Sequence, residues 1–120
     1  MDEFLCEMGK RISKRRKELG MTQEDLAEKA GLTSQTVSTA ETGTKALRPQ
    51  NIVKLCKALE TSADYVLFGE ISSVDLGLLS GEISALSPEH YRYWENITKS
   101  YLAAIKIRKS LPEDDSFQQL

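Results

Sequence analysis

The sequence predicts an all-α protein, and three features lead to this prediction. Apolar residues recur at spacings of three and four through most of the 120 residues, as they do along one face of a helix. Serine or threonine, which cap helix starts, precedes several of these segments, and glycine follows several of them. Two prolines, Pro49 and Pro88, occupy plausible first positions of helices.

The first helix is expected over about residues 3–19. Its apolar stripe consists of Phe4, Leu5, Met8, Ile12 and Leu19. Residues 10–17 also carry six positive charges in eight positions. Such a run is usually a solvated face, but beside a helix that reads DNA it is also what contact with phosphates requires.

Residues 22–43 predict two short helices joined by a tight turn, which is a helix-turn-helix. Thr22 can cap the first helix. Gly31 can end it at low cost, because glycine readily adopts a left-handed conformation. Thr33 can then cap the second helix, which buries Val37 and Ala40.

The outer face of this second helix carries short or planar hydrogen-bonding side chains, namely Ser34, Gln35, Ser38 and Thr39. Glutamine can pair with adenine in the major groove, and serine or threonine can pair with several bases. The face therefore predicts direct reading of bases. An ordinary helical hairpin with a solvated polar face is the alternative, and the basic flanks disfavour it.

Two further helices are expected before residue 70. After the motif, Lys45 and Arg48 lie in a loop, and residues 49–59 predict an amphipathic helix. Residues 62–69 predict a short helix that serine caps and glycine ends.

Residues 71–120 form a different unit. Residues 71–86 are apolar enough for a helix, although two glycines weaken it, and residues 88–110 predict a long helix. One face of the long helix carries Trp94, Ile97, Tyr101 and Ile105. Two helices cannot cover so much apolar surface on each other, so it packs on the first domain, on a second subunit or on another protein. We favour a homodimer with this face as its main interface.

About residues 9–69 resemble the Cro/repressor-type helix-turn-helix family, the XRE-like regulators. The matching residues follow the family's order and spacing: Gly9, Ile12, Arg16, Leu19, Gly20, Thr22, Gln23, Leu26, Ala27, Gly31, Val37, Ser38, Glu41, Gly43, Pro49, Leu55, Ala58, Leu59, Asp64 and Tyr65. The resemblance implies a five-helix, lambda-repressor-like DNA-binding domain over residues 1–70. It implies a helical dimerisation or interaction region over residues 71–120.

The resemblance also implies roles for single residues. The positions that read bases are Ser34, Gln35 and Thr39, with Ser38 beside them. The positions that contact the DNA backbone are Gln23, Thr36, Thr44, Lys45 and Arg48. Arg16 and Glu41 match an ion pair between the first and third helices.

The overall composition adds little attraction for DNA. The formal net charge is -2, and residues 1–70 carry 11 basic and 11 acidic side chains. A local cluster of basic residues has to attract the phosphates, so we expect the affinity for DNA to depend only modestly on salt. There is no signal-peptide pattern and no run of about 20 apolar residues, so we expect a cytoplasmic protein that does not span a membrane.

These expectations describe a regulator that binds double-stranded DNA sequence-specifically. We favour a repressor that acts as a homodimer on an inverted-repeat operator. The sequence holds no paired carboxylates, no nucleophile with an orienting histidine, no phosphate-binding glycine loop and no metal cluster, so we expect no enzyme, cofactor or metal. The alternative is an antitoxin-type or other regulator whose C-terminal helices bind a partner protein.

Overall fold

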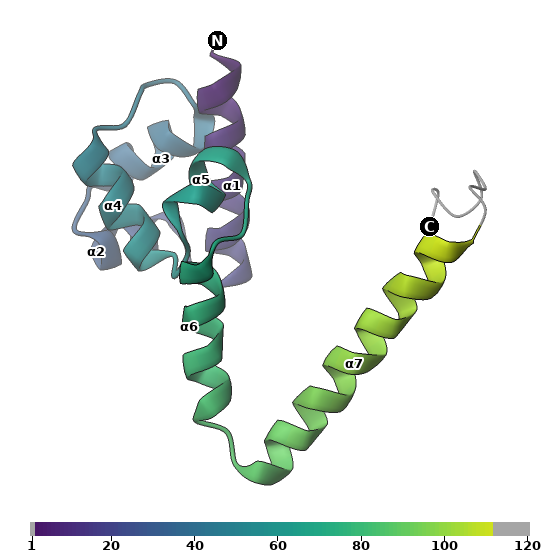
Figure 1. Ribbon diagram of the computed structural model, residues 1–120. Coiled ribbons are helices and arrows are strands. Elements are labelled where there is room, and N and C mark those ends of the chain that lie inside the picture. The colour runs from purple at the N-terminus through teal and green to yellow at the C-terminus, as the bar shows by residue number, and fades with distance from the viewer. Residues whose placement is uncertain (1, 112–120) are drawn as a thin grey trace. The chain divides into compact units, whose positions relative to one another are not determined.

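The computed structural model describes residues 2–111, and every regular element in that range is an α-helix, as the sequence predicted (Figure 1). The helices are α1 (Glu3–Glu18), α2 (Gln23–Ala30), α3 (Ser34–Thr42), α4 (Pro49–Ala58), α5 (Ala63–Phe68), α6 (Ser73–Ser84) and α7 (Pro88–Ser110). The chain divides into two compact units, and the boundary falls after Ser80, inside α6. The sequence alone suggested a boundary near residue 70.

Local sequence determines where the short helices of the first unit begin and end. Threonine or serine at positions 22, 33 and 62 caps α2, α3 and α5, each accepting a hydrogen bond from the backbone N–H three residues later. At α2 the cap is reciprocal, because Asp25 Oδ2 accepts from the Thr22 N–H at 2.9 Å. The same helices end at glycines with φ of 70°, 72° and 75°. The expected starts and ends are confirmed.

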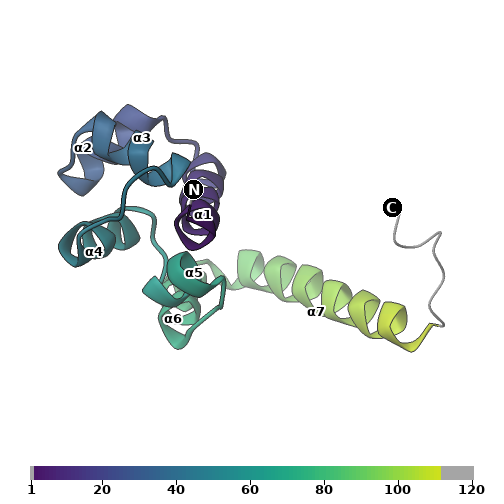
Figure 2. The same ribbon diagram turned by 90° about the horizontal axis from the view of Figure 1, so that it is seen from above.

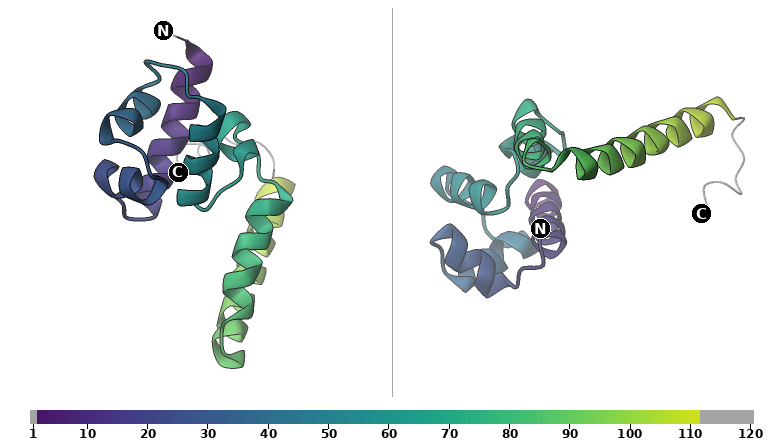
Figure 3. Two further views of the ribbon diagram at one scale, coloured as in Figure 1. Left: turned by 90° about the vertical axis from the view of Figure 1, so that its left-hand side faces the viewer. Right: turned by 90° about the horizontal axis from the view of Figure 1, so that it is seen from below.

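The core of the first unit lies where its five short helices meet. Helix α1 packs against α3 and α5, α2 packs against α3 and α4, and α4 packs against α5, as Figures 2 and 3 show. The largest fully buried side chains are Ile12, Leu26, Val37, Leu55, Leu59 and Val66. Each of the helices α1 to α5, or the residue that follows it, contributes to this set, so α3 is held by a shared core.

Two glycines let α1 approach the end of α3 closely. A Cβ on Gly9 would clash with the backbone carbonyl groups of Ala40 and Glu41. A Cβ on Gly43 would lie 2.7 Å from the backbone nitrogen of Cys6, and Gly43 also has a φ of +72°. A side chain at either position would push α3 away from α1, so these glycines help to set the position of α3.

Asp75 fastens the first turn of α6 to the loop before α5. Its carboxylate accepts hydrogen bonds from the Ser62 hydroxyl at 2.6 Å, the Ser62 N–H at 2.8 Å and the Thr61 hydroxyl at 3.0 Å. It also accepts from the Ser72 N–H at 2.9 Å. Thr61 and Ser62 are buried, so Asp75 satisfies polar groups that have lost water. The first unit therefore includes the start of α6.

The second unit contains the long helix α7. Ser87 caps it by accepting from the His90 N–H, and Pro88 occupies its first position, as predicted. Several apolar side chains along the helix are exposed, including Ile97 at 70% and Tyr101 at 66%. Two residues of the apolar face that the sequence identified are therefore exposed, whereas Trp94 and Ile105 of that face are half-buried.

Candidate nucleic-acid interface

The exposed side of α3 is built from small polar side chains. Ser34 and Gln35 are exposed, and Ser38 and Thr39 are half-buried. The helix carries one charged residue, Glu41, whose carboxylate is engaged in an ion pair described below. The surface that α3 presents is therefore uncharged and able to donate and accept hydrogen bonds, which suits the edges of bases.

Hydrogen bonds hold the threonine hydroxyls of α3. The hydroxyls of Thr33 and Thr36 lie 2.9 Å apart, and Thr39 Oγ1 donates to the Thr36 carbonyl at 3.1 Å. Thr44 Oγ1 reaches the Thr39 carbonyl at 3.4 Å. The bond to the Thr36 carbonyl uses the hydroxyl proton of Thr39, so toward DNA the Thr39 side chain is best suited to accept.

A hollow of about 210 Å³ lies between α3 and the loop before α4. It is lined by Gln35, Thr36, Thr39, Lys45, Ala46, Leu47, Arg48 and Asn51. The structure thus brings base-reading candidates and backbone-contacting candidates around one concave surface. Asn51 was not identified from the sequence, because it lies on a different helix from the motif. The proline two residues before it, which starts α4, was the available signal.

A bidentate ion pair connects α1 to α3. Arg16 Nε lies 2.7 Å from Glu41 Oε2, and Arg16 Nη2 lies 3.0 Å from Glu41 Oε1. The two side chains are 11% and 6% exposed. Arg16 also donates to the Met21 carbonyl at 2.8 Å, so the guanidinium braces the turn before α2. A planar guanidinium suits this two-point contact better than an ammonium group does.

The same carboxylate holds Gln23, the candidate phosphate anchor. Gln23 Nε2 donates to Glu41 Oε1 at 3.2 Å. Burial raises the pKa of Glu41, but hydrogen bonds from Arg16 and Gln23 lower it by more, so the pKa lies below its usual range. The hydrogen bond to Glu41 raises the pKa of Arg16. Both groups are therefore charged at neutral pH.

The basic run of α1 has a mainly structural use that the sequence did not reveal. Arg11 Nη1 donates to the carbonyls of Val66 and Leu67, each at 3.1 Å. Arg15 Nε donates to the Leu59 carbonyl at 3.0 Å. With Arg16 in its ion pair, all three arginines of the run support the packing of α1, and the three lysines are its exposed charges.

The C-terminal candidates lie on α7, in the second unit. Ile97 and Tyr101 are exposed, while Trp94 and Ile105 are half-buried. The Trp94 ring lies 5.6 Å from the Tyr91 ring, centroid to centroid. All four candidates are thus on one helix, two of them open to solvent.

No helix within residues 2–111 combines the length and apolar character needed to cross a bilayer. In that range there is also no group of three or more histidine, cysteine, aspartate or glutamate side chains that could hold a metal ion.

Comparisons with known proteins match the part of the chain that holds the hollow. A family model described as helix-turn-helix matches residues 12–66, which include α2, α3 and the loop to α4. Repressor protein C2 of Salmonella phage P22 is 35% identical over 69 residues, which are 58% of this chain and 32% of that protein. The chain thus spans about a third of the length of this curated relative.

Solved structures agree in fold. The P22 c2 repressor in complex with synthetic operator 9T has a TM-score of 0.51 and 36% identity, covering 52% of this chain and 96% of that chain. The restriction-modification controller protein C.AhdI from Aeromonas hydrophila has a TM-score of 0.50 and 32% identity, covering 52% and 94%. A structure of the SinR protein/SinI protein complex has a TM-score of 0.51 and 25% identity, covering 80% and 98%.

Proposed function

The chain belongs to the Cro/repressor-type (XRE-type) helix-turn-helix family, and we propose that it regulates transcription by binding double-stranded operator DNA. In this proposal it is a repressor that binds an inverted repeat as a homodimer. The observation that carries the proposal is the hollow beside α3, where Gln35 and Thr39 adjoin Lys45 and Arg48. A surface that combines uncharged hydrogen-bonding groups with flanking cations fits base edges and phosphates together.

Base reading is assigned to Ser34, Gln35, Ser38 and Thr39. Gln35 is the strongest of these candidates, because it is exposed, lines the hollow and has an amide that can pair with adenine in two places. Ser34 is exposed at the first turn of α3, where recognition helices usually approach the bases.

Phosphate contacts are assigned to Gln23, Thr36, Thr44, Lys45 and Arg48. Lys45 and Arg48 are exposed in the loop between α3 and α4. Gln23 starts α2, where backbone N–H groups and the helix dipole favour an anion. Glu41 uses one of the two N–H donors of the Gln23 amide, and the other remains for a phosphate oxygen.

Dimerisation is assigned to α7 through Trp94, Ile97, Tyr101 and Ile105. Two exposed apolar side chains of this set would lose contact with water in the dimer. Two copies of α3 in such a dimer would read half-sites one helical turn apart, about 34 Å.

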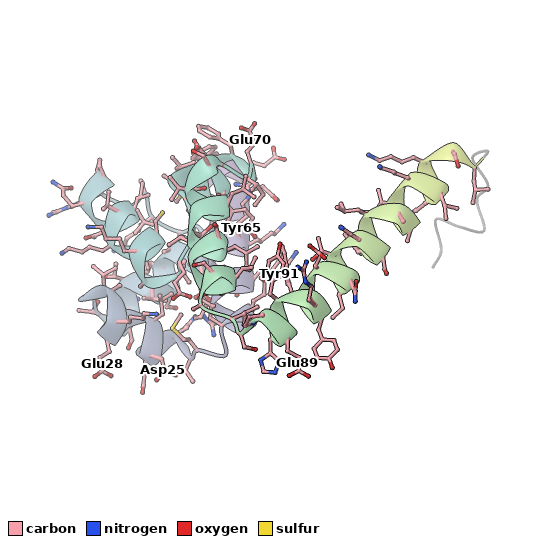
Figure 4. The ribbon with its side chains drawn as sticks, turned by 60° about the horizontal axis from the view of Figure 1, so that its bottom comes forward. Asp25, Glu28, Tyr65, Glu70, Glu89 and Tyr91 are labelled. Atoms are coloured by element: carbon pink, nitrogen blue, oxygen red, sulfur yellow. The ribbon has the colours of Figure 1, made fainter. Side chains whose placement is uncertain are left out.

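Selection of bound sequences from random duplex DNA with the full-length chain tests the proposal. The expected result is an enriched inverted repeat, with half-sites separated by one turn. A Gln35→Ala chain, selected in parallel, should lose the preference at one position in each half-site, whereas Glu28→Gln on the outer side of α2 (Figure 4) should select the same sequence. Recovery of unenriched DNA by the unaltered chain would overturn the proposal.

A second candidate function is that of a regulator whose C-terminal helices bind a partner protein, as an antitoxin does. It is supported by the open apolar face of α7 and by the likeness to the SinR protein/SinI protein complex. Co-expression with the product of the adjacent gene separates the two. A stable complex that contains one copy of the chain and the partner would favour this candidate over the homodimer.

A further inference from the structure

The charges of α7 are distributed unevenly along its length. Its acidic residues, Glu89 and Glu95, both lie in the N-terminal third, whereas residues 96–110 carry four cations and no acid. Glu95 lies 3.2 Å from Arg92 and 3.9 Å from Lys99, so its charge is paired within the helix. Residues 88–95 hold two acids and one arginine, a formal net charge of -1, whereas residues 96–110 carry +4. The helix is therefore negative toward its N-terminal end and positive toward its C-terminal end.

The apolar face of α7 has the repeat of a two-helix interface. Residues at alternating spacings of three and four run along it, namely Tyr91, Trp94, Thr98, Tyr101, Ile105 and Arg108. We call these six residues the seam. A repeat of this kind keeps one face of a helix in contact with a second helix over its whole length. At the N-terminal end of the seam, the side chains of Tyr91 and Glu89 point to opposite sides of the helix (Figure 4).

We propose that two copies of the chain pair antiparallel through this seam. The inference rests on the proposed homodimer and adds its orientation and register. Symmetry about a point between Thr98 and Tyr101 places Trp94 of one copy against Ile105 of the other. It also places Arg108 near the Tyr91 ring of the other copy, over which Arg92 of that same copy lies at 5.6 Å from the centroid.

Charge decides between the two orientations. A parallel pair would bring the two positive ends, each with Lys106, Arg108 and Lys109, within the 8–10 Å that separates packed helices. An antiparallel pair instead brings each positive end to the Glu89 end of the other copy. Like charges side by side cost free energy and opposite charges lower it, so the sequence of α7 favours antiparallel pairing.

Disulfide trapping in the full-length chain tests the orientation. We would prepare Tyr91→Cys and Arg108→Cys separately, one of them with a tag that changes its mobility, and oxidise each alone and as a mixture. The expected result is a mixed disulfide dimer from the mixture and little dimer from either variant alone. The unaltered chain under the same oxidation controls for Cys6 and Cys56.

Charge reversal provides a second test that leaves all six seam residues unaltered. Changing Lys106 and Lys109 to Glu should raise the dimer dissociation constant about tenfold or more, because the altered end would then meet Glu89 and Glu95 of the other copy. Adding Glu89→Lys and Glu95→Lys in the same chain should bring the dissociation constant back toward that of the unaltered chain. Both variants retain the acidic residues at 113–115, so the contribution of those residues is common to both.

The outcomes separate the orientation from the dimer itself. Disulfide formation by each variant alone, with a charge reversal that leaves the dissociation constant unchanged, would mean a parallel pair and would overturn the inference. The unaltered chain could sediment as a dimer while neither cysteine variant, alone or mixed, forms a disulfide. This result would place the dimer interface away from α7. A monomer by sedimentation would overturn the proposed homodimer as well, whereas selection of operator DNA reports on DNA binding independently.

Discussion

The side-chain amide of Gln23, at the start of α2, donates a hydrogen bond to Glu41 of α3 at 3.2 Å. The same carboxylate binds the guanidinium of Arg16 at two points. A residue proposed to contact phosphate is thus oriented by an ion pair that holds α1 against the recognition helix. Stability of the fold and placement of a DNA contact depend on one buried carboxylate.

The first prediction concerns that ion pair. Arg16→Met alone and Glu41→Leu alone should each lower the free energy of unfolding by about 3–5 kcal/mol, because each leaves a buried charge without its partner. The double variant should show a smaller decrease in the free energy of unfolding than the more destabilised single variant. Urea unfolding followed by circular dichroism measures all three, and additive losses would contradict a coupled pair.

The exposed pair formed by Lys10 and Glu7 is a matched control. Its side chains are 72% and 48% exposed, and the ions lie 3.0 Å apart. Lys10→Met should change the free energy of unfolding far less than either single change in the buried pair, because water screens an exposed pair.

The second prediction concerns Asp75 and acid. Burial raises the pKa of Asp75, but the hydrogen bonds from Ser62, Ser72 and Thr61 lower it by more, so the pKa is held well below its usual range. In the unfolded chain the pKa is about 3.9. The folded state therefore binds fewer protons, and the stability from Asp75 is present above about pH 4 and lost as pH falls toward the folded pKa.

Asp75→Asn should accordingly lower stability most at neutral pH. The difference in unfolding free energy between the two chains should be constant above about pH 5 and should narrow below about pH 4. Glu70→Gln, at an exposed position before α6, is the control for loss of a charge. A difference that widened in acid would contradict the assigned role of the carboxylate.

The third prediction concerns base reading by Gln35. Gln35→Ala should weaken binding to the selected operator by about 1–3 kcal/mol and relax the preference at one base position per half-site. Its affinity for random DNA should change little. Fluorescence anisotropy with operator and random duplexes measures this, and equal losses on the two would indicate a backbone contact.

The fourth prediction concerns the loop cation Lys45. Lys45→Ala should weaken all sequences similarly and reduce the slope of log affinity against log salt by about one unit for each copy that contacts DNA. Lys57→Ala is a matched control, because Lys57 lines a separate groove between α4 and α6. If both variants kept the original slope, Lys45 would not be a phosphate contact.

The fifth prediction concerns the separation of the two units. A fragment that ends at Ser80 should fold, remain monomeric and bind the operator more weakly than the full chain, because the second half-site contact is no longer tethered. A fragment that ends at Gly69 should fold but be less stable by about 1.5–3 kcal/mol, since it lacks the charged acceptor for Thr61 and Ser62. Sedimentation measures the oligomeric state of the two fragments, and urea unfolding measures their stability. A dimeric 1–80 fragment would show that the dimer interface lies in the first unit.

Much of the fold could be predicted because its signals are local. Thr22, Thr33 and Ser62 cap helices through backbone groups three residues away, and Gly31 and Gly43 end helices through their own conformation. These interactions lie within one turn, so the order of residues reveals them. The faces of α3 and α7 likewise follow from a helical period of 3.6 residues.

The long-range partners could not be predicted in the same way. Six charges in residues 10–17 suggested contact with phosphates. Arg11, however, donates to the carbonyls of Val66 and Leu67, which are 55 and 56 positions later in the sequence. Asp75 was assigned no role, although it holds the start of α6 against the loop before α5. Asn51 joined the hollow only because the loop before α4 folds back beside α3.

The sequence by itself determined the helices, their caps and the polar face of α3, because each depends on neighbours within about four residues. Only the tertiary structure decided which arginines are used in packing, how Glu41 orients Gln23, and where the first unit ends. Those outcomes depend on distances between elements, which packing of the core sets and which no local pattern encodes.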